Sequence, residues 1–216
     1  MKKNLLLNWV VILLALAPAG YLLWLWPLLP DTVPVHFGAD MKPDRMGPKA
    51  ELWIPVLILS VISLFVYFLF KNIHRIDPKR KDAAQAATFQ KLGVGTAVFM
   101  AALNVLIIHS SQNGGTSPNL LFPLLGFMFA FLGNYMVHIK PNYFAGFRLP
   151  WTLSSDENWR KTHELGGKIW FAGGLAIAVI SLFLPATAAF SFFLVAIVVM
   201  ALIPIVYSYR LFKKQA

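Results

Sequence analysis

Six apolar segments alternate with polar segments along the chain: residues 5–29, 52–70, 92–108, 120–137, 169–184 and 188–209. Each is close to the roughly 20 apolar residues that a helix needs to cross a bilayer. The apolar residues are continuous instead of alternating with polar ones, which predicts helices and not the strands of a barrel. The first segment begins like a signal peptide, with Ala15-Leu16-Ala17 as a cleavage site. It stays apolar to Leu29, however, and therefore predicts a retained span.

Composition indicates a membrane protein as well. Of the 216 residues, 58% are hydrophobic and 13% are charged, against about 45–50% and about 25% in soluble domains. Six spans of about 20 residues would use about 120 positions, which leaves loops but no separate soluble domain. The chain has no cysteine, so disulfides, thiol nucleophiles and thiolate metal sites are excluded.

Lysine and arginine gather in alternate polar segments. Sixteen of the 19 lie at the N-terminus, in residues 71–91, in residues 138–168 and in the C-terminal tail, whereas residues 30–51 contain three. Because cytoplasmic segments are enriched in these cations, we expect both termini inside and residues 30–51 outside. The same bias explains the net charge of +10 without a direct nucleic-acid partner.

The predicted outer loop, residues 30–51, is rich in proline and glycine, which predicts fixed turns and not a helix. Residues 33–37 are β-branched and aromatic, and they predict a short strand on the outer surface. His36, Asp40 and Asp44 are candidate metal ligands by residue type, but their spacing fits no calcium or zinc motif. The alternative is that the two acids make turn hydrogen bonds and that His36 is a surface histidine.

The predicted inner loop, residues 133–168, alternates aromatic residues with cations. This mixture favours a segment that lies at the headgroup level of the membrane, and a docking surface for a cytoplasmic partner is the alternative. Ser154 and Glu157 have the spacing of a capping box, so we expect a helix to begin there. That helix would carry Trp159 and His163 on one face and continue into the fifth span. The aromatic residues are Tyr143, Phe144, Phe147, Trp151 and Trp159, and the cations are Lys140, Arg148, Arg160 and Lys161.

No motif in the sequence predicts an enzyme. His163-Glu164 begins like a zinc-protease motif, but glycine stands where the second histidine would be. The six apolar segments contain no Asp, Glu, Lys or Arg, whereas proton-coupled transporters usually carry such residues inside the bundle. We therefore expect no catalytic site, no cofactor and no metal. A membrane enzyme with a histidine-bound metal stays as an alternative.

The inner loop resembles the core motif of the SdpI family, the immunity proteins against a sporulation-delaying peptide toxin. The family pattern runs Gly-Asn-Tyr, Lys-Pro-Asn, a Gly-Ile-Arg-Thr-Pro-Trp-Thr-Leu element, Trp, and Thr-His followed by glycines. In this chain the pattern falls at Gly133-Asn134-Tyr135, Lys140-Pro141-Asn142, Gly146-Phe147-Arg148-Leu149-Pro150-Trp151-Thr152-Leu153, Trp159, Thr162-His163 and Gly166-Gly167.

The outer loop resembles a small N-terminal domain of unassigned function that often precedes this motif. The shared elements are Leu-Pro-x-x-Val-Pro-x-His-Phe and Pro-Asp-x-x-Gly-Pro-Lys, which begin here at Leu29 and Pro43. The chain departs from the usual pattern at Met41, where glycine is common, and at Met46, where tryptophan is common. Further departures are His138, Phe147 and Leu149.

The resemblance implies a multi-pass immunity protein of the bacterial cell membrane that gives resistance to a secreted, membrane-active peptide toxin. It also implies signalling, in which the toxin-engaged protein holds a small cytoplasmic repressor at the membrane. A permease or channel-like protein for a small solute or peptide is the alternative. The expected docking residues on the inner side are Asn134, Lys140, Pro141, Asn142, Arg148, Pro150, Trp151, Trp159 and His163. The expected ligand residues on the outer side are Pro34, His36, Asp40 and Asp44.

The expected architecture is all-α: a polytopic helical bundle of six transmembrane helices, N-in and C-in, with an interfacial amphipathic segment in the inner loop. Residues 1–70 would form a two-span unit with the outer loop at 30–51. Residues 71–91 would form a basic cytoplasmic loop, and residues 92–216 an SdpI-like four-span unit with its motif at 133–168.

Overall fold

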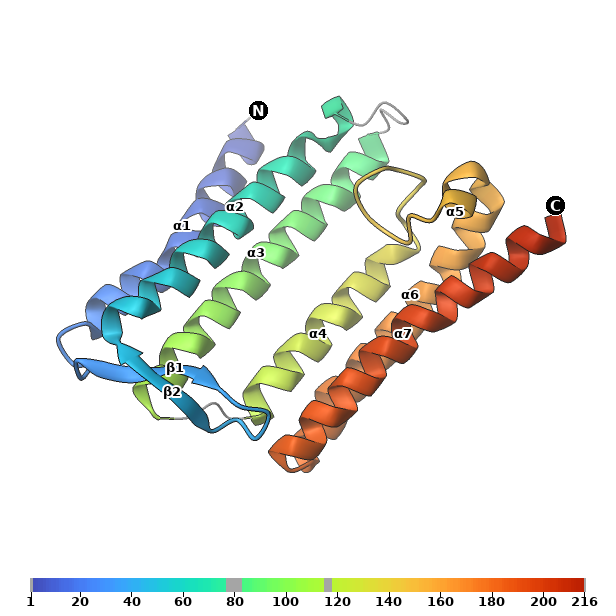
Figure 1. Ribbon diagram of the computed structural model, residues 1–216. Coiled ribbons are helices and arrows are strands. Elements are labelled where there is room, and N and C mark those ends of the chain that lie inside the picture. Colours follow the sequence, from blue (N-terminus) through green and yellow to red (C-terminus); the bar gives the residue numbers. More distant parts are fainter. Residues whose placement is uncertain (1, 77–82, 115–117, 216) are drawn as a thin grey trace.

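The computed structural model describes residues 2–76, 83–114 and 118–215 of the chain. Within these residues long helices dominate, and they run side by side at similar tilts (Figure 1). One two-stranded sheet interrupts the helical architecture. In chain order the elements are α1 (Lys2–Leu25), β1 (Thr32–Phe37), β2 (Pro43–Pro48), η1 (Lys49–Leu52), α2 (Trp53–Ile76), α3 (Ala83–Gln112), α4 (Pro118–Met136), α5 (Pro150–Ser154), α6 (Asp156–Ile180), η2 (Ser181–Phe183) and α7 (Ala186–Gln215).

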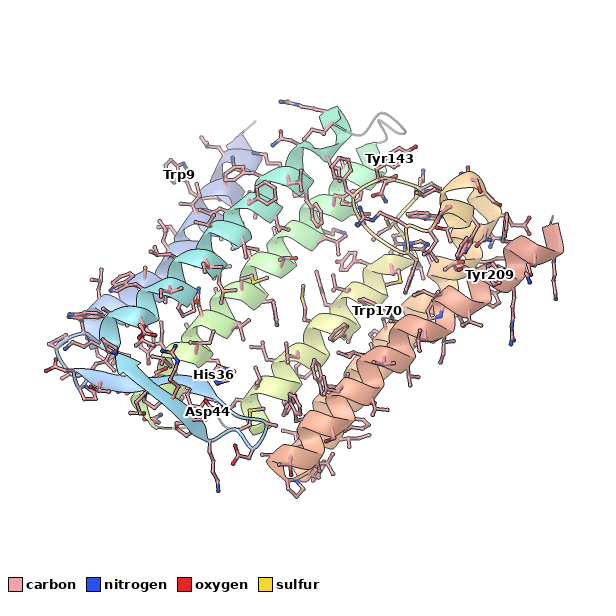
Figure 2. All side chains as sticks on the ribbon, in the orientation of Figure 1. Trp9, His36, Asp44, Tyr143, Trp170 and Tyr209 are labelled. Carbon is pink, nitrogen blue, oxygen red and sulfur yellow. The ribbon has the colours of Figure 1, made fainter. Side chains whose placement is uncertain are left out.

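Five of the six predicted apolar segments form the main part of a long helix, and the segment 169–184 supplies the second half of α6, which ends at Ile180. Five stretches are long and apolar enough to cross a membrane by length and composition, and α4 contributes a shorter apolar stretch, Leu120–Met136. Large apolar side chains such as Trp9 project outward from the helices (Figure 2), as expected for surfaces that face lipid instead of water. The five long stretches are Leu5–Leu25, Lys49–Ile73, Gln85–Gln112, Asp156–Phe183 and Ala186–Lys214.

Helices α2 and α3 are longer than their apolar segments. Residues 71–76 and 83–91, which the sequence analysis placed in a basic loop, are helical, because the lysine, glutamine and alanine residues there are good helix formers. The remainder of that loop, residues 77–82, lies outside the described residues. Lys71 also holds α1 and α2 together at this end, since its Nζ donates to Asn8 Oδ1 at 2.8 Å.

The helices form two groups of three. Helices α1, α2 and α3 pack together, and helices α4, α6 and α7 pack together, with the most extensive contacts between α2 and α3 and between α4 and α6. The two groups meet along α3 and α4. The backbones of α4 and α6 approach closely, because a Cβ on Gly126 would lie 2.5 Å from the carbonyl oxygen of Gly174. Small residues at such a contact let membrane helices pack backbone to backbone.

The predicted outer loop folds as a β-hairpin, which adds a sheet to the architecture expected to be all-α. Strands β1 and β2 are antiparallel, with Thr32 opposite Pro48 and Phe37 opposite Pro43. The strand predicted at residues 33–37 is confirmed as β1. The sequence analysis did not predict β2, because it begins and ends with proline. Proline is tolerated here since each strand of a two-stranded sheet is an edge strand.

The two loops singled out by the sequence lie at opposite ends of the bundle. The hairpin lies beside the end of α3 and the turn between α6 and α7, whereas the loop before α6 lies at the end that holds both termini (Figure 1). His36 and Asp44 mark the hairpin end, and Tyr143 marks the opposite end (Figure 2). A ligand at one loop is therefore separated from a ligand at the other by the length of the helices.

Candidate functional site

The middle of the predicted inner motif folds into a loop between α4 and α6, called the motif loop here (residues 137–155), which lies beside the end of α4 (Figure 1). The remaining motif residues lie in the last turn of α4, as Asn134 does, and in the first half of α6, as Trp159 and His163 do. Its short helix α5 begins at Pro150, where proline is favoured because the first N–H of a helix has no partner within it. Thr152 fixes this start. The Leu149 N–H donates to Thr152 Oγ1 at 2.9 Å, and that hydroxyl donates to the Phe147 carbonyl at 2.6 Å.

Helix α6 begins one residue later than the capping box predicts. The side chain of Ser155 is the cap, and its Oγ accepts a hydrogen bond from the Asn158 N–H at 3.2 Å. The predicted cap, Ser154, instead ends α5, where its hydroxyl donates to the Trp151 carbonyl at 3.2 Å. Helix α6 then runs unbroken to Ile180, so the predicted continuation into the fifth apolar segment is confirmed.

Asn142 organises the first half of the motif loop, and its side chain is fully buried. Its Nδ2 donates to the carbonyls of Lys140 and Ala145, at 2.9 and 3.1 Å. Its Oδ1 accepts from the N–H groups of Phe144 and Ala145, both at 2.8 Å. These four bonds use both donors and both acceptor positions of the amide. Asn142 therefore shapes the loop and has no capacity left for a partner.

His163 ties the motif loop to α6. Its ring is 1% exposed and stacks on Trp159, as the predicted shared face requires, with ring centroids 4.0 Å apart. Nε2 lies 3.0 Å from the Phe147 amide nitrogen, and Nδ1 lies 2.8 Å from the Trp159 carbonyl oxygen. Because an amide donates and a carbonyl accepts, the ring carries its proton on Nδ1 and is neutral. Gly146 has φ 105°, and a Cβ there would overlap His163 Nε2, so the motif requires glycine at this position.

The second half of the motif loop is fixed to the C-terminal helix α7. Trp151 Nε1 donates to Ser208 Oγ at 2.9 Å, and Asn158 Nδ2 donates to the Ser208 carbonyl at 3.0 Å. The Trp151 ring also packs on Tyr209 and Phe212. The sequence analysis named neither Asn158 nor Ser208. The two are 50 residues apart, and no local pattern links them.

The nine predicted docking residues differ in their access to a partner. Trp159, near the start of α6, is buried against the motif loop, and its Nε1 donates to the Ile139 carbonyl at 2.7 Å, so its ring is not exposed to headgroups as the aromatic pattern predicted. Arg148 is exposed, and its Nη1 donates to the carbonyl of Tyr143 at 2.6 Å. Pro141, Asn142, Trp159 and His163 are buried, Trp151 is half-buried, and Asn134, Lys140, Arg148 and Pro150 are exposed.

In the hairpin, the structure brings together two of the four predicted ligand residues. His36 Nδ1 lies 2.6 Å from Asp44 Oδ1. Asp40 Oδ1 accepts from the Lys42 N–H at 3.1 Å, which is the predicted turn hydrogen bond, whereas Asp44 pairs with the histidine instead. Pro34 is buried in β1. Among the described residues, no three His, Asp or Glu side chains are grouped as a metal site.

Met41, in the hairpin turn, joins the hairpin to the second helix group. Its φ is 61°, a conformation that side chains other than glycine rarely adopt. Its side chain is 8% exposed and belongs to the same apolar cluster as Phe122, Ile177 and Ala189, from α4, α6 and α7. The sequence analysis noted Met41 as a departure from a glycine that is common in the family. The positive φ gives the physical reason for that glycine.

Two regions of the chain match models of known families. The model of the SdpI/YfhL protein family matches residues 138–208, and the model of a domain of unknown function, DUF1648, matches residues 13–59. A stretch of 55 residues is 44% identical to an uncharacterized protein of Archaeoglobus fulgidus, and it covers 23% of this chain and 30% of that relative. The chain thus spans about a third of that relative's length. No solved structure matches the chain. The SdpI/YfhL match thus includes the motif loop from residue 138, α6 and most of α7, and the hairpin lies within the DUF1648 match.

Proposed function

We propose that this chain is a multi-pass protein of the cell membrane that protects the cell against a secreted, membrane-active peptide toxin. The observation that carries the proposal is the family match over residues 138–208, in which the motif loop and the adjoining start of α6 lie at one end of a helical bundle. A non-enzymatic role is part of the proposal, because the SdpI/YfhL family is not a known enzyme family.

In this proposal all six long helices cross the membrane. Helix α4 is the shortest of them, but it runs from the hairpin end of the bundle to the motif-loop end (Figure 1). Its 19 residues correspond to about 28 Å at a rise of about 1.5 Å per residue. The hydrocarbon core of a bilayer is about 30 Å thick. The length of α4 therefore suits a crossing, with the motif loop and the hairpin on opposite sides.

The charges at the two ends support an orientation with the motif loop and both termini in the cytoplasm. Asp31, Asp40, Asp44 and Glu51 lie in the hairpin region together with three cations. The opposite end is rich in exposed cations, as cytoplasmic ends are. These cations include Arg75, Lys91, Lys140, Arg148, Lys168, Arg210, Lys213 and Lys214.

The signalling part of the proposal assigns a cytoplasmic repressor with an acidic surface to the exposed side of the motif loop. Arg148 is the central contact in this assignment, because its guanidinium has five N–H groups and one of its nitrogens is engaged by the Tyr143 carbonyl. Arginine also forms paired hydrogen bonds with carboxylates. The buried motif residues would act indirectly, by holding Arg148 in place.

Survival tests the protective role. The protein is expressed in a sensitive bacterium, its presence in the membrane fraction is verified, and the cells are challenged with the sporulation-delaying peptide and several other membrane-active peptides. We expect selective survival against at least one peptide, relative to cells with the empty vector. Failure of the inserted protein to protect against every peptide would contradict the proposal. Solute flux in proteoliposomes would then test the permease alternative.

A reporter of toxin-induced transcription in the native host tests the signalling role. The Arg148→Ala variant is expected to lose induction and keep protection. Arg160→Ala is the matched control, because Arg160 is also exposed but forms an ion pair with Glu164 on its own helix at 2.8 Å. Full induction by Arg148→Ala would contradict docking at the motif loop, whatever the outcome of the survival assay.

A further inference from the structure

A cavity of about 640 Å³ lies between the hairpin and the helices. Strand β1 and the hairpin turn cover it, α3 supplies most of its helical side, and α2, α4 and α7 contribute one residue each. Both helix groups therefore line it. Its volume falls within the range of about 300–1,000 Å³ that is typical of ligand pockets. The apolar residues from α3, α4 and α7 are Leu103, Leu106, Ile107, Leu121 and Phe190.

One edge of this cavity is acidic. Gly38 belongs to the lining, and a Cβ placed on it would lie 3.1 Å from Asp40 Oδ1 and 3.6 Å from Asp44 Oδ2. Two carboxylates therefore converge on the same glycine at the hairpin turn. Lys42 belongs to the same turn, and His36 Nδ1 lies 2.6 Å from Asp44 Oδ1. The edge therefore offers carboxylate oxygens to a ligand.

The polar groups named at the cavity are hydrogen-bond acceptors. The buried Ser110 hydroxyl donates its proton to the Leu106 carbonyl at 2.8 Å, so its oxygen can only accept from a ligand. The carboxylate oxygens of Asp40 and Asp44, which lie beside Gly38, are acceptors as well. A ligand that suits this lining brings apolar groups together with N–H donors or a positive charge.

We infer that this cavity binds an apolar segment of a cationic amphipathic peptide, whose cation lies beside Asp40 and Asp44. The inference rests on the proposed function, because it assigns a binding site on the outer side to the peptide. Charge decides between a peptide and a membrane lipid. Phospholipid headgroups contain a phosphate, which the two carboxylates would repel, whereas a lysine or arginine side chain would be attracted.

Binding is measured with the full chain in nanodiscs of zwitterionic phosphatidylcholine. The probe is a short fluorescent peptide of leucine and lysine, and the matched probe carries glutamate in place of each lysine. Empty nanodiscs give the background of both probes. Ile107→Trp fills the cavity, and Val98→Trp is its control, because Val98 is on the same helix but 51% exposed and outside the lining. Asp40→Asn with Asp44→Asn removes the acidic edge.

We expect the lysine probe to bind the wild type at least about tenfold more tightly than the glutamate probe. Ile107→Trp is expected to weaken the lysine probe by about tenfold or more, and Val98→Trp to leave it unchanged. The double asparagine variant is expected to abolish the preference for the lysine probe. Its two positions are exposed, so this test does not require the helices to repack as Ile107→Trp does. Asp31→Asn is its control, since Asp31 lies in the same region but pairs with Lys49 at 3.3 Å.

Two results would overturn the inference. One is wild-type affinity in a folded Ile107→Trp variant, and the other is equal binding of the two probes, which would indicate a lipid-like apolar site. Survival separates this inference from the proposed function. If the wild type protects cells while Ile107→Trp and the double asparagine variant both bind the lysine probe as the wild type does, the cavity site is wrong and the proposed function stands. If the cavity binds the lysine probe selectively but the wild type does not protect cells, the site stands and the proposed function is wrong.

Discussion

Replacing Met41 by alanine and by glycine separates two opposing effects at the tip of the hairpin. The methionine side chain is 8% exposed and shares an apolar cluster with α4, α6 and α7, which favours the native hairpin position. The backbone of Met41 has φ 61°. This conformation is unfavourable for every residue with a Cβ, so it disfavours the native hairpin turn. Alanine removes the side-chain contacts and keeps the strain. Glycine removes both.

The expected magnitudes follow from these two observations. Truncation of a buried methionine to alanine typically costs about 2–5 kcal/mol. We expect about 2 kcal/mol here, because Met41 also lines the outer cavity, so the packing around it is incomplete. The left-handed conformation costs a residue other than glycine about 1–2 kcal/mol. The greater freedom of glycine in the unfolded chain cancels about 0.4–1 kcal/mol of that relief. Glycine should therefore be more stable than alanine by roughly 0.5–1 kcal/mol.

Thermal unfolding in nanodiscs, followed by the fluorescence of the seven tryptophans, measures this order. A change of about 1 kcal/mol corresponds to about 2–4 °C for a chain of this size. We expect the wild type to be most stable, then Met41→Gly, then Met41→Ala. Met46→Ala is the control, because Met46 is 54% exposed, and it should change stability by less than about 0.5 kcal/mol. An alanine variant as stable as glycine refutes the strain argument, and a glycine variant as stable as the wild type refutes the packing argument.

Two further substitutions test the packing of the second helix group by the same thermal assay. Gly126→Ala should destabilise the protein by about 1–3 kcal/mol, because its Cβ would meet the α6 backbone. Gly20→Ala is the control: it has open space around it and should stabilise α1 by roughly 0.5–1 kcal/mol. Equal effects of the two substitutions would contradict the close approach of α4 and α6. Ser208→Ala should cost about 1–3 kcal/mol, because the Trp151 indole N–H loses its acceptor. Ser191→Ala, at an exposed serine of the same helix, should have little effect, and a neutral Ser208→Ala would show that the indole finds another partner.

The helices were predictable from the sequence because membrane crossing requires long apolar runs. Each of the six runs lies mostly within a helix, since a backbone in lipid has to satisfy its hydrogen bonds within the segment. Strand β1 was predictable because Val33, Val35 and Phe37 are strong strand formers. The number of spans and the orientation are predictions from helix length and from the distribution of lysine and arginine.

The features that the sequence analysis missed depend on contacts between distant residues. Strand β2 is stabilised by pairing with β1 and not by its own residues, two of which are proline. The cap of α6 shifted from Ser154 to Ser155 because α5 ends at the former. The role of Ser208 exists only because α7 returns to the motif loop. The outer cavity likewise requires the hairpin to fold over both helix groups.

In the motif, too, the sequence predicted the residue types but not which of them are buried. Its residue types were recognisable in the sequence, and the match to the SdpI/YfhL family confirms the resemblance. Burial then divides them, because Asn142 and His163 stabilise the loop from inside while Arg148 is exposed. Residue type alone could not make that distinction, since asparagine and histidine are frequent at binding surfaces as well.

The central claim is that the hairpin and the motif loop face opposite sides of the membrane, and cysteine labelling tests it most directly. Because the chain has no cysteine, one can be introduced at Ala50 beside the hairpin or at Ser154 in the motif loop, both of which are exposed. A membrane-impermeant maleimide applied to intact cells is expected to label Ala50→Cys and to label Ser154→Cys only after permeabilisation. Labelling of Ser154→Cys in intact cells, alone or together with Ala50→Cys, would contradict the orientation and with it the roles proposed for both loops.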